Sequence, residues 1–422
     1  MASIFGFTIG KKKKDDEIVK SVVSPTGQDG SLVLNTNVAG GVSGESYLLA
    51  FDPDGQIKNE MDLIKRYRDL SKTPYVAEAI EDIVNEAIVM DGDDPPVSLD
   101  LDELKVSEGL KKKINDAFNE VLNLLNFNVD GYDVFKNWYI DGKILYQIIL
   151  DEKNVKDGIK ELRYIDPRKI KKIKNIVKEA ASGGFEVVKS IEEYYIYNDR
   201  GIVDGRSTGI KLSKDSVIHC HSGLIDQSNG LLLSHLHKAI KPANQLKMLE
   251  ESVVIYRYTR APERRVFYID VGNLPKGKAE QYVQTMMNKF KNKLSYDAVT
   301  GDVVDSKRHL SMMEDFWMPR RDGGKGTEII TLPGGAGLGQ LDDLDYFLNL
   351  LQRALNVPIS RTKPDTGFSI GKSDTVSRDE IKFNKFIGKL RSRFNSLFLD
   401  ALRVHLIAKG IISDDDWSET KE

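Results

Sequence analysis

The amino-acid sequence predicts an α+β protein with more than one domain, and three observations support this. The chain has 422 residues, which is enough for two or three domains of ordinary size. Segments with apolar residues at helical spacing alternate with short runs of β-branched and aromatic residues, so helices and strands are mixed along the chain. Residues 263–335 read as a small α/β insert between helices at 243–260 and 341–356.

Residues 1–55 are predicted to form a flexible N-terminal arm. They hold a run of lysines at 11–14, followed by a stretch rich in Gly, Ser, Asn and Val that has no helical period. The apolar residues precede the basic ones, which is the reverse of a secretory signal, and no apolar run is long enough to cross a membrane. With Cys220 as the single cysteine, the sequence predicts a soluble protein in a reducing compartment.

The region 56–240 is predicted to be a mixed α+β domain. Its expected helices are 60–70, 74–90 and 107–126, and its expected strands are 97–104, 143–151 and 192–199. The second helix carries its apolar residues on one face, at Val76, Ala79, Ile80, Ile83, Val84, Ala87 and Ile88.

Helices and strands also alternate after residue 240. The expected elements are a helix at 243–260, a strand at 264–272, a helix at 278–294, a hairpin at 294–305, a strand at 327–332 and a helix at 341–356. A last long helix is predicted at 377–409, where Ser377 and Glu380 match a capping box.

The stretch TGFSIGKSD, residues 366–374, ends with the same letters as a phosphate-binding P-loop. A P-loop has four residues between its two glycines, but only three separate Gly367 from Gly371. The preceding segment is polar and broken by Pro364 rather than a buried strand, and the predicted helix starts late, at Ser377. The sequence therefore predicts that no nucleotide binds here.

Two His-x-His pairs are candidate metal ligands. His219 and His221 share one face of a predicted strand, but His235 and His237 fall in a predicted helix, where such positions point about 200° apart. No third ligand and no catalytic set of residues stands out. We therefore expect no metal, no cofactor and no enzymatic activity.

Two clusters of basic residues stand out in a chain whose net charge is −3. One comprises Arg257, Arg260, Arg264 and Arg265, at the junction of a helix and the insert; the other comprises Arg320, Arg321 and Lys325. A solvated surface, salt bridges between chains and docking of an acidic partner all remain open for them. The overall charge argues against a protein that binds nucleic acid tightly along its whole surface.

Several strings resemble the portal vertex protein of T4-like tailed bacteriophages. They include NQLKMLEESVVIYRYTRAPERRVFYIDVG, MMEDFWMPRRDGGKGTEIITLPGG, LNVPISR and SRDEIKFNKFIGKLRSRF. The resemblance runs from about residue 46 to near the end and is clearest over 215–400. It implies a ring of about twelve identical subunits, joined head to tail, at one vertex of the phage head.

The resemblance also implies a division of the chain into parts. These are an arm at 1–55, a wing at 56–240, stem helices at 241–262 and 336–357, a clip at 263–335, a channel loop at 358–375, and a long wing helix at 376–422. Members of the family continue beyond the position where this chain stops with a helical crown, so we expect the last part to include only the start of a crown, either because the sequence is partial or because the crown is absent.

Function and partners follow from the resemblance as expectations. Double-stranded DNA would pass through the channel without sequence-specific contacts, packaged by a separate terminase motor and later ejected. The loop residues expected to face DNA are Lys363, Gly367, Phe368, Ser369, Gly371, Lys372 and Ser373. Arg320, Arg321 and Lys325 would dock the terminase large subunit or the neck proteins, and the four arginines at the stem–clip junction would contact neighbouring subunits.

Major capsid, scaffold and head-completion proteins are further expected partners. The expected location is the virion, after assembly in the host cytoplasm or at its inner membrane. Two alternatives stay open: another ring-forming head–tail connector, and a nucleotide-binding enzyme that uses Gly371-Lys372-Ser373.

Overall fold

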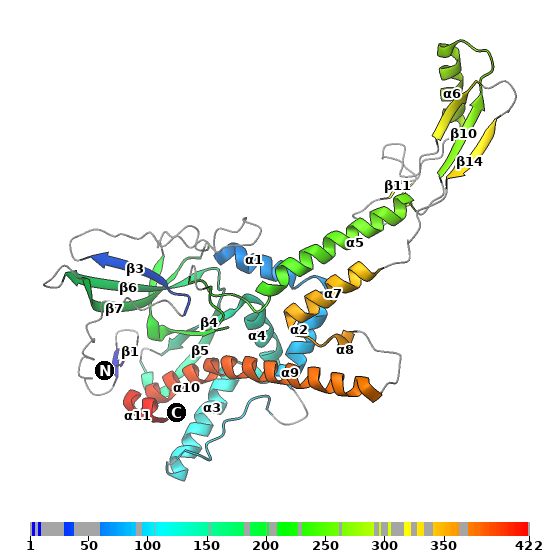
Figure 1. Cartoon of the computed structure of the whole chain (residues 1–422). Helices are drawn as coiled ribbons and strands as arrows, with labels where there is room; N and C mark the ends of the chain where they lie inside the picture. The colour runs from blue at the N-terminus through cyan, green and yellow to red at the C-terminus, as the bar shows by residue number, and fades with distance from the viewer. Residues whose placement is uncertain are drawn as a thin grey trace. The chain divides into compact units, whose positions relative to one another are not determined.

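The computed structural model describes eighteen segments of the chain, which are residues 2–4, 7–9, 29–37, 60–89, 95–104, 106–151, 153–180, 186–199, 201, 209–226, 230–260, 264–290, 295–296, 303–304, 316–321, 327–332, 341–362 and 370–420. The chain forms two units, shown in Figure 1. The main unit comprises Met1–Lys241 with Leu351–Glu422, and the inserted unit comprises Pro242–Leu350.

The first three helices of the main unit begin within one residue of the predicted positions. Helix α1 spans Glu60–Leu70, α2 spans Pro74–Ala87 and α3 spans Glu108–Leu124. Every residue of the predicted apolar face of α2 is buried. The predicted strand at 97–104 is wrong: the segment forms no strand and turns at Asp102, whose backbone N–H donates to Asp100 Oδ1 at 2.9 Å. Carboxylates that bond nearby backbone favour turns over strands.

Helix α4, Phe127–Asp141, was not predicted from the sequence. Most of its apolar side chains are buried, so it lacks the one-sided pattern that marks a surface helix. Gly142 ends it with φ of 76°, and a Cβ there would lie 2.8 Å from the carbonyl oxygen of Leu233. Glycine is required because the chain must reverse closely into strand β4.

Two sheets complete the main unit. The first has the order β3-β6-β7-β8, with strands Leu32–Asn37, Ile170–Ala180, Glu186–Tyr197 and Ile210–Ser213. The second is antiparallel with the order β5-β4-β9, from Ile159–Ile165, Lys143–Leu150 and Val217–His221. The predicted strands at 143–151 and 192–199 are confirmed as β4 and part of β7. A short pair, β1 (Ala2–Ile4) and β2 (Phe7–Ile9), lies at the N-terminus.

The C-terminal helices run differently from the prediction. Helix α9 spans Ile370–Phe394, α10 spans Ser396–Lys409 and α11 spans Asp414–Thr420. The predicted start at Ser377 is wrong: the chain is already helical from Ile370, seven residues earlier, and residues 370–377 contain no proline that would prevent this. The capping box is wrong as well, since the Glu380 carboxylate accepts hydrogen bonds from Arg361.

Aromatic rings join α9 and α10 to α4. The Phe394 ring lies 5.0 Å from Phe135 and 5.3 Å from Trp138, measured between centroids. The Phe398 ring meets Phe127 edge-on at 4.8 Å. Rings in such tilted or edge-on pairs contribute beyond their buried area, so this cluster holds the long C-terminal helices against the rest of the core.

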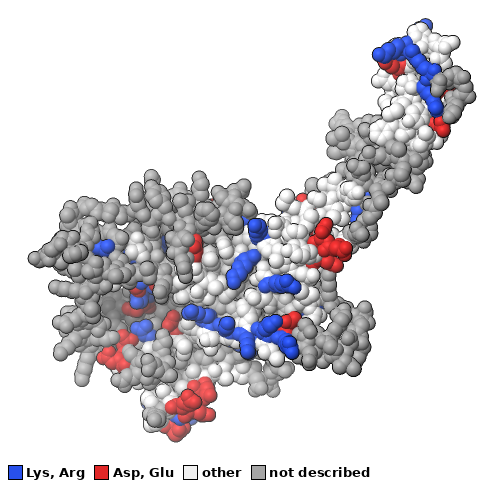
Figure 2. Space-filling view, viewed as in Figure 1, with Lys and Arg blue, Asp and Glu red and all other residues white. Residues whose placement is uncertain are grey.

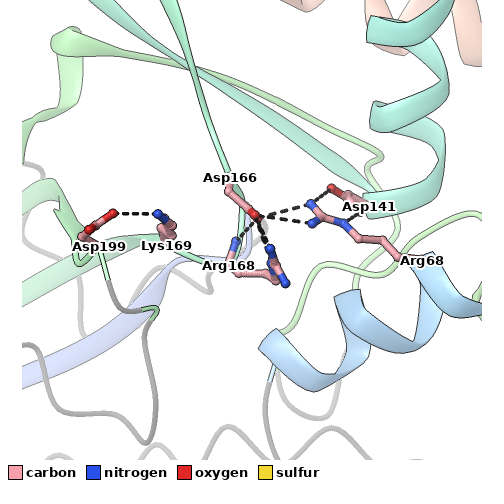
Figure 3. A network of polar contacts seen from close by, with 6 residues as sticks. All are labelled: Arg68, Asp141, Asp166, Arg168, Lys169 and Asp199. Carbon is pink, nitrogen blue, oxygen red and sulfur yellow. Dashed lines mark hydrogen bonds and ion pairs between the residues drawn. The ribbon is translucent and has the colours of Figure 1, made fainter.

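Ion pairs fix α1 and α4 to the ends of the strands (Figure 3). Arg68 donates to both carboxylate oxygens of buried Asp141, with Nη2–Oδ2 at 2.6 Å, and its Nη2 lies 3.2 Å from Asp166 Oδ1. Arg168 closes on Asp166 from the other side at 2.6 Å. Burial raises the pKa of Asp141, and the Arg68 guanidinium opposes this by stabilising the charged carboxylate.

The inserted unit contains a three-stranded sheet with one helix against it. Helix α5 (Ile240–Arg260) leads into β10 (Arg264–Asp270), and α6 (Lys276–Phe290) follows. The sheet order is β13-β10-β14, with β13 at Phe316–Arg320 and β14 at Glu328–Leu332. Ile269, Val271, Ala279 and Val283 are its buried cluster. Helix α7, Asp342–Leu355, returns to the main unit.

The predicted hairpin of the inserted unit is confirmed by the antiparallel pairing of β11 (Ser295–Tyr296) with β12 (Val303–Val304). Its turn at Thr300–Asp302 lies outside the described residues. In the parts of the chain that the structure describes, no helix is long and apolar enough to cross a membrane.

Candidate functional site

The predicted DNA-facing segment is shorter than expected. Helix α8, Ile359–Thr362, precedes it and α9 begins at Ile370, so seven residues, 363–369, separate the two helices. Lys363, Gly367, Phe368 and Ser369 lie outside the described residues. Gly371, Lys372 and Ser373 have helical backbone in the first turns of α9 rather than lying in a loop.

Because α9 starts at Ile370, the late helix start at Ser377 no longer counts against a P-loop. The helix does begin next to Gly371-Lys372-Ser373, so its start is not late. The two other reasons remain, because only three residues separate Gly367 from Gly371 and the last described element before the segment is helix α8 rather than a strand.

Arg361 joins α8, which precedes the 363–369 segment, to Glu380, which lies ten residues into α9. Its Nε donates to Glu380 Oε1 at 3.0 Å and its Nη2 donates to Glu380 Oε2 at 2.9 Å, which is a bidentate pair between α8 and α9. The same Nη2 lies 3.3 Å from Glu86 Oε2 of α2. The guanidinium also lies 4.4 Å from the ring centroid of buried Phe383. We call Arg361, Glu380, Glu86 and Phe383 the loop base.

Arg391 adds a second tie between α9 and α2. Its Nε donates to the carbonyl oxygen of Ala87 at 2.9 Å, and its Nη2 donates to that of Glu86 at 2.6 Å. These carbonyls belong to the last turn of α2, which has no intrahelical donors for them. A cation at this end also complements the helix dipole. Arg391 therefore stabilises the C-terminal end of α2 and positions α9 beside it.

Charges at the loop base shift each other's proton affinity. Hydrogen bonding to Glu380 raises the pKa of Arg361, and hydrogen bonding from Arg361 lowers the pKa of Glu380. Burial raises the pKa of Asp82, and the nearby carboxylates Glu81, Glu380 and Glu86 raise it further, while Arg361 opposes them. Arg361 is therefore the cation that allows several carboxylates to lie together where α2, α8 and α9 meet.

Sequence reasoning did not identify the loop base. Arg361 lies 275 residues from Glu86 and 19 from Glu380, so no local spacing links them. Glu380 was assigned to a cap because the chain was expected to become helical only at Ser377. The signal that could have been used is Arg361 itself, a cation two residues before the segment KPDTGFS that separates two helices.

The basic residues predicted to dock a partner, Arg320, Arg321 and Lys325, differ in what the structure shows around them. Arg320 Nη1 donates to Glu328 Oε2 at 2.6 Å and its guanidinium lies 5.5 Å from the Tyr268 ring centroid. Arg321 is exposed, and its Nη2 reaches the Leu274 carbonyl oxygen at 3.5 Å. Lys325 lies outside the described residues. Arg321 is therefore more available than Arg320 to an acidic partner.

The four arginines predicted at the stem–clip junction lie on two elements, the helix α5 and the strand β10. Arg257 is half-buried on α5, and Arg260 is the last residue of that helix. Arg264 and Arg265 begin β10, where they pair in register with Leu332 and Thr331 of β14. Their contact with a neighbouring subunit remains a prediction.

Neither His-x-His pair gathers further ligands. His219 and His221 lie on β9 with ring centroids 5.7 Å apart, and burial lowers the pKa of His219 well below its ordinary value. The predicted helix over the second pair is wrong. His235 lies in a turn, stacked on Tyr139, and His237 begins a 3₁₀ turn, with its Nδ1 2.8 Å from the Tyr67 hydroxyl. Among the described residues, no group of three or more His, Cys, Asp or Glu could hold a metal ion.

Comparisons with known proteins give a consistent result. Residues 60–422 match the family model described as bacteriophage T4-like portal protein (Gp20). The portal protein of Vibrio phage KVP40 is 39% identical over 427 aligned positions, which cover 97% of this chain and 82% of that protein. The portal protein of Salmonella phage ViI is 34% identical, covering 97% of this chain and 75% of that protein.

Among solved structures, two chains from particle necks are similar. One comes from the neck of a native GTA particle computed with C12 symmetry, with 12% identity, a TM-score of 0.47, and coverage of 82% of this chain and 81% of that chain. The other comes from the neck of an empty GTA particle computed with C6 symmetry, with 14% identity, a TM-score of 0.45, and coverage of 83% and 82%.

Proposed function

The chain belongs to the family of bacteriophage T4-like portal proteins, and from this we propose that its copies form a closed ring at one vertex of a phage head. Genomic DNA is packaged through the ring by the terminase motor and leaves through it at ejection. The ring also joins the head to the neck proteins. The protein has no catalytic activity of its own, and the work of packaging is done by the motor.

The observation that carries this proposal is the family match over residues 60–422, which extends through parts of both units of the chain. Two portal proteins also align over 97% of the chain, so the likeness is not confined to one shared domain. The chain composition supports a conduit. A net charge of −3 disfavours the many phosphate contacts that make a protein hold DNA tightly.

In this proposal the parts of the chain have separate tasks. The main unit supplies the wing, the inserted unit supplies the clip with parts of the stem helices α5 and α7, and about twelve copies join head to tail. Exposed Arg321, together with Lys325, docks the terminase large subunit and later the neck proteins. Capsid and scaffold proteins contact the wing during assembly in the host cell.

The 363–369 segment and the first turns of α9 are proposed to reach the DNA in the channel. Gly367 provides freedom of the backbone, while Lys363 and Lys372 offer weak, sequence-independent contacts to phosphate. The loop base supports this role because it joins α8, before the segment, to α9, after it.

A reconstituted packaging reaction tests the proposal. Heads assembled from the capsid and scaffold proteins of the parent phage with this chain are supplied with terminase, ATP and DNA, and the DNA protected from nuclease is measured. We expect protection only when the chain is present. Protection that is equal without the chain would contradict the proposal.

The loop has its own test. Deletion of residues 365–372 is expected to leave particle assembly intact and to reduce the protected DNA. If the deletion abolishes assembly instead, the segment has a structural role and the DNA-contacting role is wrong.

A further inference from the structure

Helix α9 carries a row of basic side chains on its exposed face that no function above uses. Its members are Arg378, Lys382, Lys385, Lys389 and Arg393, all exposed and spaced four, three, four and four residues apart. This spacing keeps them on one side of a helix. Figure 2 shows a row of Lys and Arg side chains at the place where Figure 1 draws α9. We call these five residues the α9 basic stripe.

The stripe lies opposite the buried side of the helix. Phe383, Ile387, Leu390 and Phe394 are each at most 2% exposed and form the face that packs into the core. On a 3.6-residue repeat they lie about 120–180° away from Arg378. The five basic side chains are therefore directed to solvent by the same periodicity that buries the aromatic face.

The stripe has little negative charge to balance it. Residues 378–394 contain six basic and two acidic side chains, a net charge of +4 against −3 for the whole chain. Glu380 is taken by Arg361, and Asp379 pairs with Lys382 at 3.0 Å. Within the described residues, Arg378, Lys385 and Lys389 make no ion pair.

On other exposed helices some lysines pair with an acid one turn away, as Lys65 does with Asp62 and Lys247 does with Glu251. Like charges three or four residues apart slightly destabilise a helix. The stripe repeats like charges at this spacing over its whole length, and an anionic partner would offset their repulsion.

We propose that the α9 basic stripe binds the backbone of double-stranded DNA. The inference rests on the portal function proposed above. From Arg378 to Arg393 the stripe is about 22 Å long, at about 1.5 Å per residue, which corresponds to about six base pairs at 3.4 Å each. It begins eight residues after the start of α9.

The composition of the stripe favours phosphate contacts over base contacts. Three of its five members are lysines, which act as point charges toward phosphate. Among the described side chains of α9 no aromatic one is exposed, so it lacks the rings on which single-stranded bases stack. The partner is therefore duplex DNA, held weakly and without sequence preference, as a surface beside moving DNA requires.

The test is the salt dependence of DNA binding by the full chain. Fluorescence anisotropy with a labelled 60-base-pair duplex of random sequence gives the affinity between about 50 and 300 mM salt. The variant replaces Lys382, Lys385 and Lys389 with Gln. Losing three phosphate contacts lowers the slope of log affinity against log salt by about 2 to 3, at about 0.9 for each contact.

The matched control replaces Lys111, Lys112 and Lys113 of α3 with Gln, which removes the same charge from another surface helix. Its slope is expected to stay close to that of the wild type. A third variant, with Arg at all three α9 positions, retains the charge and is expected to retain the slope. Thermal melting checks that each variant is folded.

Three results would overturn the inference. They are an unchanged slope in the α9 variant, an equal loss in the α3 control, and a loss of assembly with unchanged DNA affinity, which would make the stripe a contact between copies. Each leaves the portal function standing, because that function is tested separately by packaging with the wild-type chain.

Discussion

Replacement of Arg361 by Ala isolates the contribution of the loop base. The change removes the bidentate pair with Glu380, the contact with Glu86 and the contact with the Phe383 ring. The side chains of Arg361 and Glu380 are 28% and 31% exposed, so solvent screens the pair and it contributes about 0.2–1 kcal/mol. The cation–π contact adds about 0.5–1 kcal/mol. We expect a total loss of about 1–2 kcal/mol.

This loss is expected to act locally. A change of about 1–2 kcal/mol corresponds to a 5- to 30-fold increase in the population of an opened state. Hydrogen exchange measured by mass spectrometry on peptides covering α8 and the start of α9 should therefore speed up by about this factor. Helices away from the loop base, such as α3, should exchange as in the wild type.

The matched control for Arg361 is Arg403. It makes a similar pair with Asp414, with Nε–Oδ1 at 3.1 Å and Nη2–Oδ1 at 2.9 Å, at comparable exposure but between α10 and α11. Arg403→Ala should speed exchange near α11 only. If both variants affect α8 and the start of α9 equally, or if neither does, the loop base does not position the segment.

Three further predictions concern the core, the acid stability and the inserted unit. Phe394→Ala removes a fully buried ring from the aromatic cluster and is expected to cost about 3–5 kcal/mol in denaturant unfolding; a cost below about 1 kcal/mol would contradict the packing described. Burial would raise the pKa of Glu60, but Lys143 and Lys171 outweigh burial and hold this pKa at about 2. The charged carboxylate therefore stabilises the fold above about pH 4.5 by at most about 3 kcal/mol. This contribution is lost as the pH falls toward 2. Glu60→Gln should therefore lower stability at neutral pH and flatten its decline in acid melting curves, and an unchanged curve would refute the assignment. Arg321→Glu should weaken copurification with the terminase large subunit more than Arg320→Glu does, since Arg320 is paired with Glu328; the reverse order would contradict the docking proposal.

Local pattern was enough for the elements that have one polar and one apolar side. Helix α2 was predicted with its whole buried face because its apolar residues repeat at helical spacing. Helix α4 was missed because Phe127, Phe135 and Trp138 are buried on several sides, which leaves no polar face to reveal a period. Strand β6 was missed because lysines interrupt its apolar positions, and only its pairing with β3 and β7 makes it a strand.

The functional residues also differ in whether the sequence alone could indicate them. The family likeness pointed to the segment near Gly371, but the helix start at Ile370 shows that part of this segment is helical. The residues that hold the segment, Arg361, Glu86 and Arg391, come together only through the tertiary fold. Their partners lie too far along the chain for any motif to link them, so the structure was needed to find them.

The proposed portal function requires that copies of this chain form a closed ring with a central channel. Electron microscopy of the purified protein, with end-on views averaged into classes, shows directly whether they do. We expect closed rings with a central hole wide enough for duplex DNA and a rotational symmetry of about twelve. Particles that remain monomeric, or that assemble into open filaments without a central hole, would contradict it.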